Sequence, residues 1–331
     1  MVATILRNKK KEEEEEGTMS EPILIAQGLK KSYGEIEAVK GISLQVARGE
    51  VFGLLGPNGA GKTTAISMLT GLLEPNAGRI SVDGLDLETH TNEVKAKLGL
   101  VPQELALYPT LSARQNLVFF GRIYGLKGKG LKQRVDEVLE MIGLTERADG
   151  AIKSYSGGMK RRVNIGAGLL HKPDVLFLDE PTVGVDPQSR NAIFESVEAL
   201  NRAGMSVIYT THYMEEAQRL CHRVAIVDEG ELIALDTPTA LIRSLGGGIV
   251  IIGIAEGAPE DLTERIAQAA EVKAATRSDG QIKIETQRLQ EGLMATLDIT
   301  NQLDVRITSL EILEPNLESV FLNLTGKKLR Q

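Results

Sequence analysis

The feature that most constrains this chain is the glycine-rich segment GPNGAGKTT at 56–64. It follows the apolar run VFGLLG and opens a segment with helical periodicity. The spacing fits G-x-x-x-x-G-K-[ST], in which glycines let backbone N–H groups close around a phosphate and the dipole of the following helix favours an anion. The segment therefore predicts a nucleotide phosphate site, in which Lys62 reaches the β- and γ-phosphates and Thr63 binds Mg²⁺. Its predicted contacts are Gly56, Pro57, Asn58, Gly59, Ala60, Gly61, Lys62, Thr63 and Thr64.

Further apolar runs recur along the chain, separated by helical segments. VLFLD at 175–179, SVIYTT at 206–211 and RVAIVD at 223–228 are continuously apolar rather than alternating. A parallel sheet that is buried on both faces requires strands of this kind. The pattern therefore predicts an α/β fold around a parallel sheet.

A helical insertion is expected inside this core. Strand patterns disappear between 103 and 154, and helical candidates take their place at 112–124 and 131–142. We therefore expect a nucleotide-binding domain at 22–245 with a helical subdomain at about 104–160.

The C-terminal part has a different pattern and predicts a second, smaller domain at 249–331. The glycines at 246–248 are expected to form the linker. The elements that follow alternate as βαββαβ, which is the order of the ferredoxin-like α+β fold. A final helical segment is expected to close this domain, with packing on a partner protomer as the alternative, through Leu317, Val320, Phe321 and Leu324. The predicted strands are 249–255, 272–276, 281–285 and 306–312, and the predicted helices are 259–270 and 287–297.

Composition excludes several classes of protein. The formal net charge is −7, aromatic residues make up 4% and there is no Trp, which argues against nucleic acid as a partner. The single cysteine, Cys221, can form neither an internal disulfide nor a cysteine metal cluster. The apolar run IVIIGIA at 249–255 is far shorter than the ~20 residues of a membrane span. Any work at a membrane would therefore require a membrane-spanning partner.

The N-terminal segment 1–21 is expected to be a disordered tail. It contains KKKEEEEEG, which has no apolar periodicity with which to offset the entropy of ordering. Its basic residues run into a block of glutamates rather than an apolar stretch, so no signal peptide is expected, and Met19 is a second candidate start.

A second motif, VLFLDEP, ends in Asp179 and Glu180 at the end of a predicted buried strand. There Asp179 would hold Mg²⁺, and Glu180 would orient and polarise the attacking water. A GTPase would need the guanine-reading motif N-K-x-D, and the chain offers only NKKK in the tail. A small-metabolite kinase would use the phosphate loop with an arginine-rich lid, and the motifs described next disfavour it.

The set of motifs resembles that of ABC transporter ATPases over about 23–245. YSGGM at 155–159, upstream of VLFLDEP, is similar to the family signature, with Tyr155 and Met159 in place of its usual Leu and Gln. Neither change removes a phosphate ligand, so intact catalysis is expected. In order, the chain carries Tyr33 in KSYG, the phosphate loop, Gln103 in VPQE, YSGGM, VLFLDEP, Asp186 in VGVDP and His212 in TTHYMEEA.

The resemblance implies roles for these residues. Tyr33 would stack on adenine, Gln103 would contact Mg²⁺ or the attacking water, and His212 would contact the γ-phosphate. The catalytic set is then Lys62, Gln103, Glu180 and His212, and the Mg²⁺ set is Thr63, Gln103 and Asp179.

The family also implies a dimer of ATPase domains with ATP in the seam. Ser156, Gly157 and Gly158 of one copy would face the nucleotide held by the other copy, and Asp186 would organise the dimer face. Both half-sites are present in this one chain, which favours a homodimer.

YSGGMKRR, the segment 105–126 and the segment 314–326 resemble the drug- and ion-exporter subgroup, of the daunorubicin-resistance and sodium-efflux type. This resemblance implies a separate integral-membrane permease that selects the substrate, and a peripheral location at the cytoplasmic face of the membrane. The alternatives are a lipid or polysaccharide exporter, or a soluble ABC ATPase acting on ribosomes or DNA. A single cassette, one cysteine and an acidic body disfavour the soluble class. The candidate permease contacts are Tyr108, Leu111, Leu117, Phe119 and Phe120.

Overall fold

The computed structural model forms two compact units, Met1–Leu235 and Asp236–Gln331. The first unit ends before Asp236, whereas the sequence analysis extended it to 245. Apart from Glu21, the tail expected at 1–21 lies outside the described residues. The structure describes residues 21–255, 257–278, 280–313 and 315–325.

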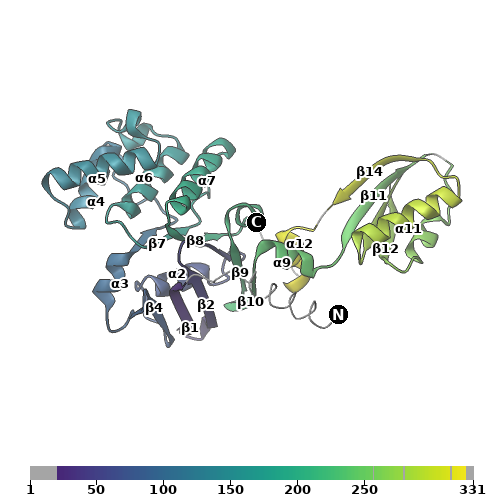
Figure 1. The fold of residues 1–331 in the computed structure, drawn as a ribbon, viewed down its shortest axis with the longest axis horizontal. Helices are drawn as coiled ribbons and strands as arrows, with labels where there is room; N and C mark the ends of the chain where they lie inside the picture. The colour runs from purple at the N-terminus through teal and green to yellow at the C-terminus, as the bar shows by residue number, and fades with distance from the viewer. Residues whose placement is uncertain (1–20, 256, 279, 314, 326–331) are drawn as a thin grey trace, which may run out of the picture. The chain divides into compact units, whose positions relative to one another are not determined.

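A six-stranded sheet forms the centre of the first unit (Figure 1), with the strand order β10-β9-β3-β8-β7-β6. The pairs β6/β7, β7/β8, β8/β3 and β3/β9 are all parallel, and β3, β7 and β8 are buried along their whole length. The continuously apolar runs are therefore confirmed as buried parallel strands. The bounds are β3 (Val51–Leu55), β6 (Leu98–Val101), β7 (Val175–Asp179), β8 (Ser206–Thr211), β9 (Arg223–Asp228) and β10 (Glu231–Asp236).

The parallel arrangement brings four loops to one edge of this sheet. Since the carboxyl ends of parallel strands lie together, the loops after β3, β6, β7 and β8 are neighbours. These loops carry the phosphate loop, Gln103, Glu180 and His212 respectively. The helices that follow β3, β7 and β8 are α2 (Lys62–Leu69), α7 (Pro187–Arg202) and α8 (Met214–Leu220).

A second, antiparallel sheet in this unit was not predicted from the sequence. Its order is β2-β1-β4-β5, and its strands mix buried and exposed positions. One hydrophobic cluster joins it to the central sheet through α2, with Leu24 of β1, Ile66 of α2 and Leu54 of β3 among its members. The bounds are β1 (Pro22–Tyr33), β2 (Ile36–Ala47), β4 (Ala77–Val82) and β5 (Leu85–Asp86).

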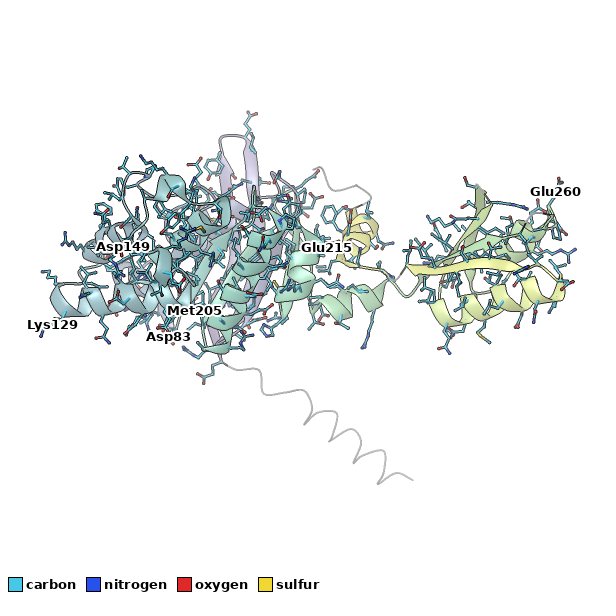
Figure 2. The ribbon with its side chains drawn as sticks, turned by 90° about the horizontal axis from the view of Figure 1, so that it is seen from above. Asp83, Lys129, Asp149, Met205, Glu215 and Glu260 are labelled. Atoms are coloured by element: carbon cyan, nitrogen blue, oxygen red, sulfur yellow. The ribbon has the colours of Figure 1, made fainter. Side chains whose placement is uncertain are left out.

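The helical subdomain lies between β6 and β7, as the sequence indicates. A capping box between Ser112 and Gln115 begins α4, and Arg114 links this helix to Asp136 of α5 and to Asp149. Figure 2 shows Asp149 and Lys129, the latter in the first turn of α5. The bounds are α4 (Ala113–Ile123), α5 (Gly128–Met141) and α6 (Gly157–Leu169), with 3₁₀ turns at Thr145–Arg147 and Ile152–Ser154, and α3 (Thr91–Lys97) precedes β6.

One predicted permease contact is wrong. Leu117 is fully buried, and Leu117 and Val138 of α5 both lie close to Gly166 of α6. Its side chain is therefore part of the subdomain core and cannot meet another protein.

The second unit contains the βαββαβ order expected from the sequence, and its antiparallel sheet has the order β12-β13-β11-β14. This is the ferredoxin-like arrangement. Its core contains Val250, Ile252, Ile282 and Ile284. The bounds are β11 (Gly248–Ile254), α10 (Leu262–Ala267), β12 (Val272–Ser278), β13 (Gln281–Thr286), α11 (Leu289–Gln302) and β14 (Ile307–Leu313), flanked by α9 (Pro238–Ser244) and α12 (Leu317–Thr325).

Two details of this unit differ from the expectation. Gly248 is part of β11, where its N–H donates to Thr286 Oγ1 and its carbonyl accepts from the same hydroxyl, so the glycine run is not a free linker. Helix α12 packs against α9, and its buried residues lie outside the core cluster of the sheet. Leu324, expected on its buried face, is exposed. Within the described ranges, no helix has both the length and the apolar character to cross a bilayer.

Candidate active site

The phosphate loop is a tight turn closed by Lys62, whose side chain is only 5% exposed. Lys62 Nζ donates to the carbonyl oxygens of Gly56, at 2.7 Å, and Pro57, at 3.0 Å. Gly61 lies at the N-cap of α2 in the left-handed region, with φ +98°, and offers no side-chain cap. The N–H groups at the start of α2 therefore face an anion-binding position, as the motif predicts.

Gly61 cannot be replaced without strain. A Cβ at this position would lie 2.5 Å from the carbonyl oxygen of Ala38, whereas a Cβ at Gly59, which also has positive φ, meets no atom within 4 Å. Gly61→Ala is expected to lower the free energy of unfolding by about 3 kcal/mol and Gly59→Ala by about 1 kcal/mol. Urea unfolding of both variants checks this, and equal losses would contradict it.

Three predicted catalytic side chains converge on Glu180, which is itself buried. Its Oε1 lies 3.1 Å from Lys62 Nζ. Its Oε2 lies 3.3 Å from His212 Nδ1 and 3.4 Å from Gln103 Nε2. The structure thus brings together the catalytic set that the sequence motifs suggested one by one.

The backbone at Glu180 is strained, with φ +44°. Non-glycine residues rarely adopt this region, and such strain is concentrated at functional sites. Its N–H donates to Thr210 Oγ1 at 2.9 Å. This turn directs the carboxylate toward Lys62 instead of along the line of β7.

Asp179 and Thr63 form the position proposed for Mg²⁺. Thr63 Oγ1 lies 3.3 Å from Asp179 Oδ2, and Thr210 donates to Asp179 Oδ1 at 2.7 Å. A carboxylate and a hydroxyl are hard oxygen ligands of the kind that Mg²⁺ prefers. These residues therefore fit the ion, and Gln103 lies on the same side of the site through its contact with Glu180.

The signature residues form a separate surface. Ser156 Oγ accepts from the N–H of Met159 and caps α6, while Asp186 Oδ1 accepts from the N–H of Ser189 and caps α7. A Cβ at Gly158 would collide with Ser189, so the two helix ends are in close contact. Within the part of the chain that the structure describes, no hydrogen bond or ion pair joins this surface to Lys62.

Asp186 is ionised at neutral pH, because hydrogen bonds from the backbone and side chain of Ser189 hold the pKa of its carboxyl below the ordinary value. Gly157 is exposed, and a Cβ there would make only an ordinary contact with the Gly184 carbonyl. The signature change at Tyr155 is accommodated, since its ring is buried and its hydroxyl donates to the Arg147 carbonyl.

Tyr33 ends β1 and is exposed, with Lys31 Nζ 5.9 Å from its ring centroid. The exposed ring is compatible with the expected stacking on adenine.

Sequence reasoning missed two residues that hold the Gln103 loop. Arg161 Nη1 donates to the carbonyls of Pro102, at 3.1 Å, and Gln103, at 2.7 Å. Asn164 Oδ1 accepts from the N–H of Ala106 at 3.2 Å. Burial lowers the pKa of the Arg161 guanidinium. The basic run KRR directly after the signature was the available signal, because a buried arginine needs carbonyl or carboxylate partners.

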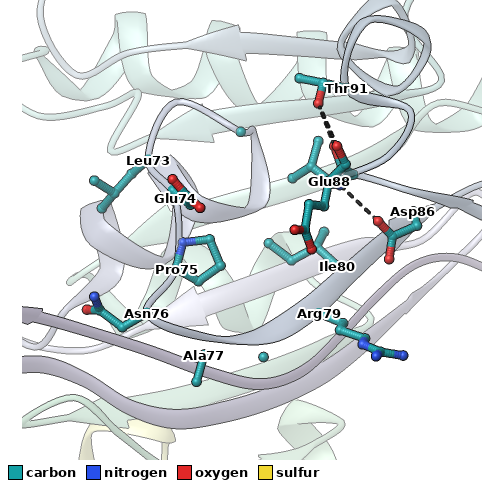
Figure 3. Close-up of a pocket in the computed structure, with 13 residues that line it drawn as sticks. Leu73, Glu74, Pro75, Asn76, Ala77, Arg79, Ile80, Asp86, Glu88 and Thr91 are labelled. Carbon is teal, nitrogen blue, oxygen red and sulfur yellow. Dashed lines mark hydrogen bonds between the residues drawn. The ribbon is translucent and has the colours of Figure 1, made fainter.

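The structure also contains a cavity of about 520 Å³ beside β4 and β5, lined by residues such as Glu74, Arg79 and Asp86 (Figure 3). It contains none of the predicted site residues. Asp86 Oδ1 accepts from the N–H groups of Glu88 and Thr89, and Thr91 donates to the Leu87 carbonyl. These polar groups stabilise their own turn, so the cavity is not the candidate active site.

In this α/β core, the lysine of a phosphate loop and a histidine both contact a glutamate that follows a buried strand. This arrangement is typical of ABC transporter ATPases. The family model described as ABC transporter matches residues 39–183. The chain is 50% identical over 310 residues to the linearmycin resistance ATP-binding protein LnrL of Bacillus subtilis, an alignment that covers 93% of this chain and 100% of that protein. The chain therefore belongs to this family, and it is an ATP-hydrolysing, ATP-binding subunit of an ABC transporter.

Two further relatives have similar coverage. The daunorubicin resistance ATP-binding protein DrrA2 of Streptomyces coeruleorubidus is 39% identical, over 92% of this chain and 95% of that protein. A Nod factor export ATP-binding protein I of Ralstonia nicotianae is 39% identical, over 95% of this chain and 97% of that protein. The resemblance to the drug-exporter subgroup is thereby confirmed.

Solved structures share the core. The cbiO1 protein of Clostridium perfringens, part of the ABC transporter complex cbiONQ, matches with a TM-score of 0.62 and 30% identity, over 68% of this chain and 94% of that chain. A dimeric ATP-binding cassette bound to ADP and Pi matches with a TM-score of 0.59 and 26% identity, over 65% of this chain and 98% of that chain. The fold prediction is therefore confirmed.

Proposed function

We propose that this chain drives export through a separate membrane permease, by ATP-dependent dimerisation of two copies. The observation that carries the catalytic part is the meeting of Lys62, Gln103 and His212 at the Glu180 carboxylate. The names of its relatives, which are linearmycin resistance, daunorubicin resistance and Nod factor export ATP-binding proteins, support the direction of transport. A drug-like cargo is the corresponding proposal for the substrate.

In the proposed reaction, water attacks the γ-phosphorus of ATP in line with the leaving oxygen. Glu180 accepts a hydrogen bond from this water and polarises it. Lys62 and the N-terminus of α2 stabilise the charge that develops on the phosphate oxygens, and His212 donates to the γ-phosphate. Bound Mg²⁺, held by Thr63 and Asp179, would add further charge neutralisation. The γ-phosphate competes with Glu180 for Lys62, because the ammonium contacts that carboxylate directly.

The signature surface supports a shared site between two copies. Ser156 and Gly157 expose the start of α6 to solvent, where backbone N–H groups and the helix dipole favour an anion. In the described residues, no hydrogen bond or ion pair joins this start to Lys62 of its own phosphate loop. A second copy would supply that phosphate, and the dimeric relative bound to ADP and Pi supports the proposal.

An aromatic surface on the helical subdomain is the proposed permease contact. Tyr108 and Phe119 are 47% and 37% exposed, and their rings meet edge to face with centroids 4.8 Å apart. Phe120 packs edge to face on Phe119 with centroids 5.3 Å apart. Exposed aromatic clusters of this kind mark sites of protein association. Through this contact the chain would sit at the cytoplasmic face of the membrane.

A pull-down from native membranes in mild detergent tests the proposal. The tagged chain is expected to recover a multi-span protein together with ATPase activity. Recovery of ribosomes or DNA-repair proteins without a membrane protein would overturn the proposal that the chain acts through a membrane permease.

A double variant, Tyr108→Ala with Phe119→Ala, is expected to lower permease recovery at least tenfold, because it removes about 2–4 kcal/mol of aromatic contact. ATP binding should be unchanged, since neither ring touches the nucleotide site. Met294→Ala, which trims an apolar side chain in the second unit that is even more exposed, at 55%, is the control. Unchanged recovery in the double variant would place the permease contact elsewhere.

A further inference from the structure

Glu216 of α8 is a buried carboxylate to which none of the catalytic roles above has been assigned. Its residue is 3% exposed. Three hydroxyl groups donate to it: Thr182 Oγ1, at 2.8 and 2.9 Å to its two oxygens, Tyr209 Oη at 3.0 Å and Thr211 Oγ1 at 2.9 Å. Burial raises the pKa of Tyr209 well above its ordinary value, so the phenol stays protonated and donates. Burying a carboxylate without hydrogen-bond donors would be strongly unfavourable, and these three hydroxyl groups offset that cost.

The donors come from the two segments that carry the reacting groups. Thr182 lies two residues after Glu180, and Thr211 directly precedes His212. Thr211 Oγ1 also accepts from the N–H of Tyr213 at 2.9 Å, which fixes the backbone on the far side of His212. The Glu216 carboxylate thus joins the loop after β7 to the carboxyl end of β8, close to where Glu180 and His212 meet.

The same carboxylate extends to the helix that Asp186 caps. Arg190 Nε lies 3.6 Å from Glu216 Oε1, and the Arg190 guanidinium lies 5.1 Å from the centroid of the Tyr213 ring. That ring is tilted against His212, with centroids 4.1 Å apart. The His212 imidazole is therefore held in place by the Tyr213 ring as well as by the backbone on either side of His212.

We propose that Glu216 is a positioning residue for ATP hydrolysis, which holds His212 in register with Glu180. This proposal rests on the roles given above to Glu180 and His212. Without the carboxylate, three buried hydroxyls lose their acceptor and the two loops lose their common attachment. A displacement of about 1 Å between reacting groups lowers a rate by about 100-fold.

Glu216→Gln tests the proposal, because it keeps the side-chain volume while an amide oxygen replaces the carboxylate. We expect kcat for ATP hydrolysis by the full chain to fall at least tenfold, with KM for ATP within twofold. Thr182→Val removes one donor without changing the size of the side chain, and it is expected to give a smaller fall in the same direction. It also keeps the test valid if Glu216→Gln does not fold.

A double-mutant cycle with His212→Ala separates positioning from a general loss of structure. If Glu216 acts through His212, neither Glu216→Gln nor Thr182→Val lowers the rate further in the His212→Ala background. Equal fold losses with and without His212 would overturn the proposal, and so would a wild-type kcat for Glu216→Gln. Full activity of His212→Ala would overturn both the role of His212 and this inference, while leaving the separate test of Glu180 intact.

Glu50→Gln is the matched control for these variants. Glu50 is also a buried glutamate, which accepts from the N–H of Ala47 at 2.7 Å and faces Arg223. It directly precedes β3, at the opposite end of the sheet from the phosphate loop. Its substitution is expected to change thermal stability but leave kcat within twofold. A loss of kcat equal to that of Glu216→Gln would show that any buried glutamate of the core has this effect, and would overturn the proposal.

Discussion

Glu180→Gln is expected to hydrolyse ATP at least about 100-fold more slowly than the wild-type chain while binding ATP more tightly. The amide keeps the shape of the side chain and a hydrogen bond with Gln103, but it no longer polarises water. The buried ion pair with Lys62 is lost as well, so the ammonium is free for the phosphates. Removing a negative charge next to the γ-phosphate adds to this effect, and together they should lower Kd by about tenfold.

The two effects are measured separately. Phosphate release at saturating ATP reports the chemical step, and equilibrium binding of a fluorescent ATP analogue reports affinity. Size-exclusion chromatography with ATP should show a trapped dimer for Glu180→Gln. Hydrolysis at the wild-type rate would remove Glu180 from its proposed role, whereas slow hydrolysis with weakened binding would point to a damaged phosphate loop.

The residues of the candidate site could be picked out in the sequence because they sit in short motifs that follow strands. Each motif fixes a local backbone: a loop before α2 for Lys62, and a strand end for Asp179 and Glu180. A parallel sheet then brings the strand ends to one edge, which places Glu180 beside Lys62, whereas Gln103 and His212 were assigned to the site from the family resemblance.

Contacts between distant segments were not readable in this way. Arg161 has its partners at 102–103 and Glu216 has one partner at 182, all more than 30 residues away along the chain, and no local pattern reports such partners. The antiparallel sheet was missed because its strands mix buried and exposed positions, and the burial of β2 alternates over its second half. The compact units divide before Asp236 rather than at the glycine run, and Gly247 and Gly248 pack closely against Thr286 and Leu289.

The prediction of permease contacts was limited for the same reason, here within the single helix α4. Leu117 and Phe119 both lie in α4, and composition alone could not tell the buried residue from the exposed one. The periodicity of α4 distinguishes the buried Leu117 from the exposed Phe119 only once the positions of α5 and α6 are known. The packing of the subdomain was therefore needed to remove Leu117 from the predicted contacts, which leaves Tyr108, Leu111, Phe119 and Phe120.

Gly157→Asp is expected to abolish hydrolysis while leaving the fold and ATP binding by single copies intact. A Cβ is tolerated at Gly157, unlike at Gly158, where it would collide with Ser189. The new carboxylate would lie at the start of α6, where the partner's γ-phosphate is proposed to bind. Two like charges about 4 Å apart repel by about 4 kcal/mol at an effective dielectric constant of 20, or about 1,000-fold in rate. Lys62→Ala is expected to be inactive for a different reason, since it removes the cation that holds the phosphates of its own chain.

Mixing these two inactive variants decides whether the site is shared. In a heterodimer, the phosphate loop of the Gly157→Asp copy faces the unchanged signature of the Lys62→Ala copy, so one of the two sites is intact. An equal mixture should then recover roughly a quarter of the wild-type single-turnover phosphate burst, because half of the dimers are heterodimers. If each chain instead completed its own site, every site in the mixture would carry one defect. No burst would then return, even where heterodimers are shown to form by differential tagging, and the signature surface would need a role other than catalysis in the partner copy.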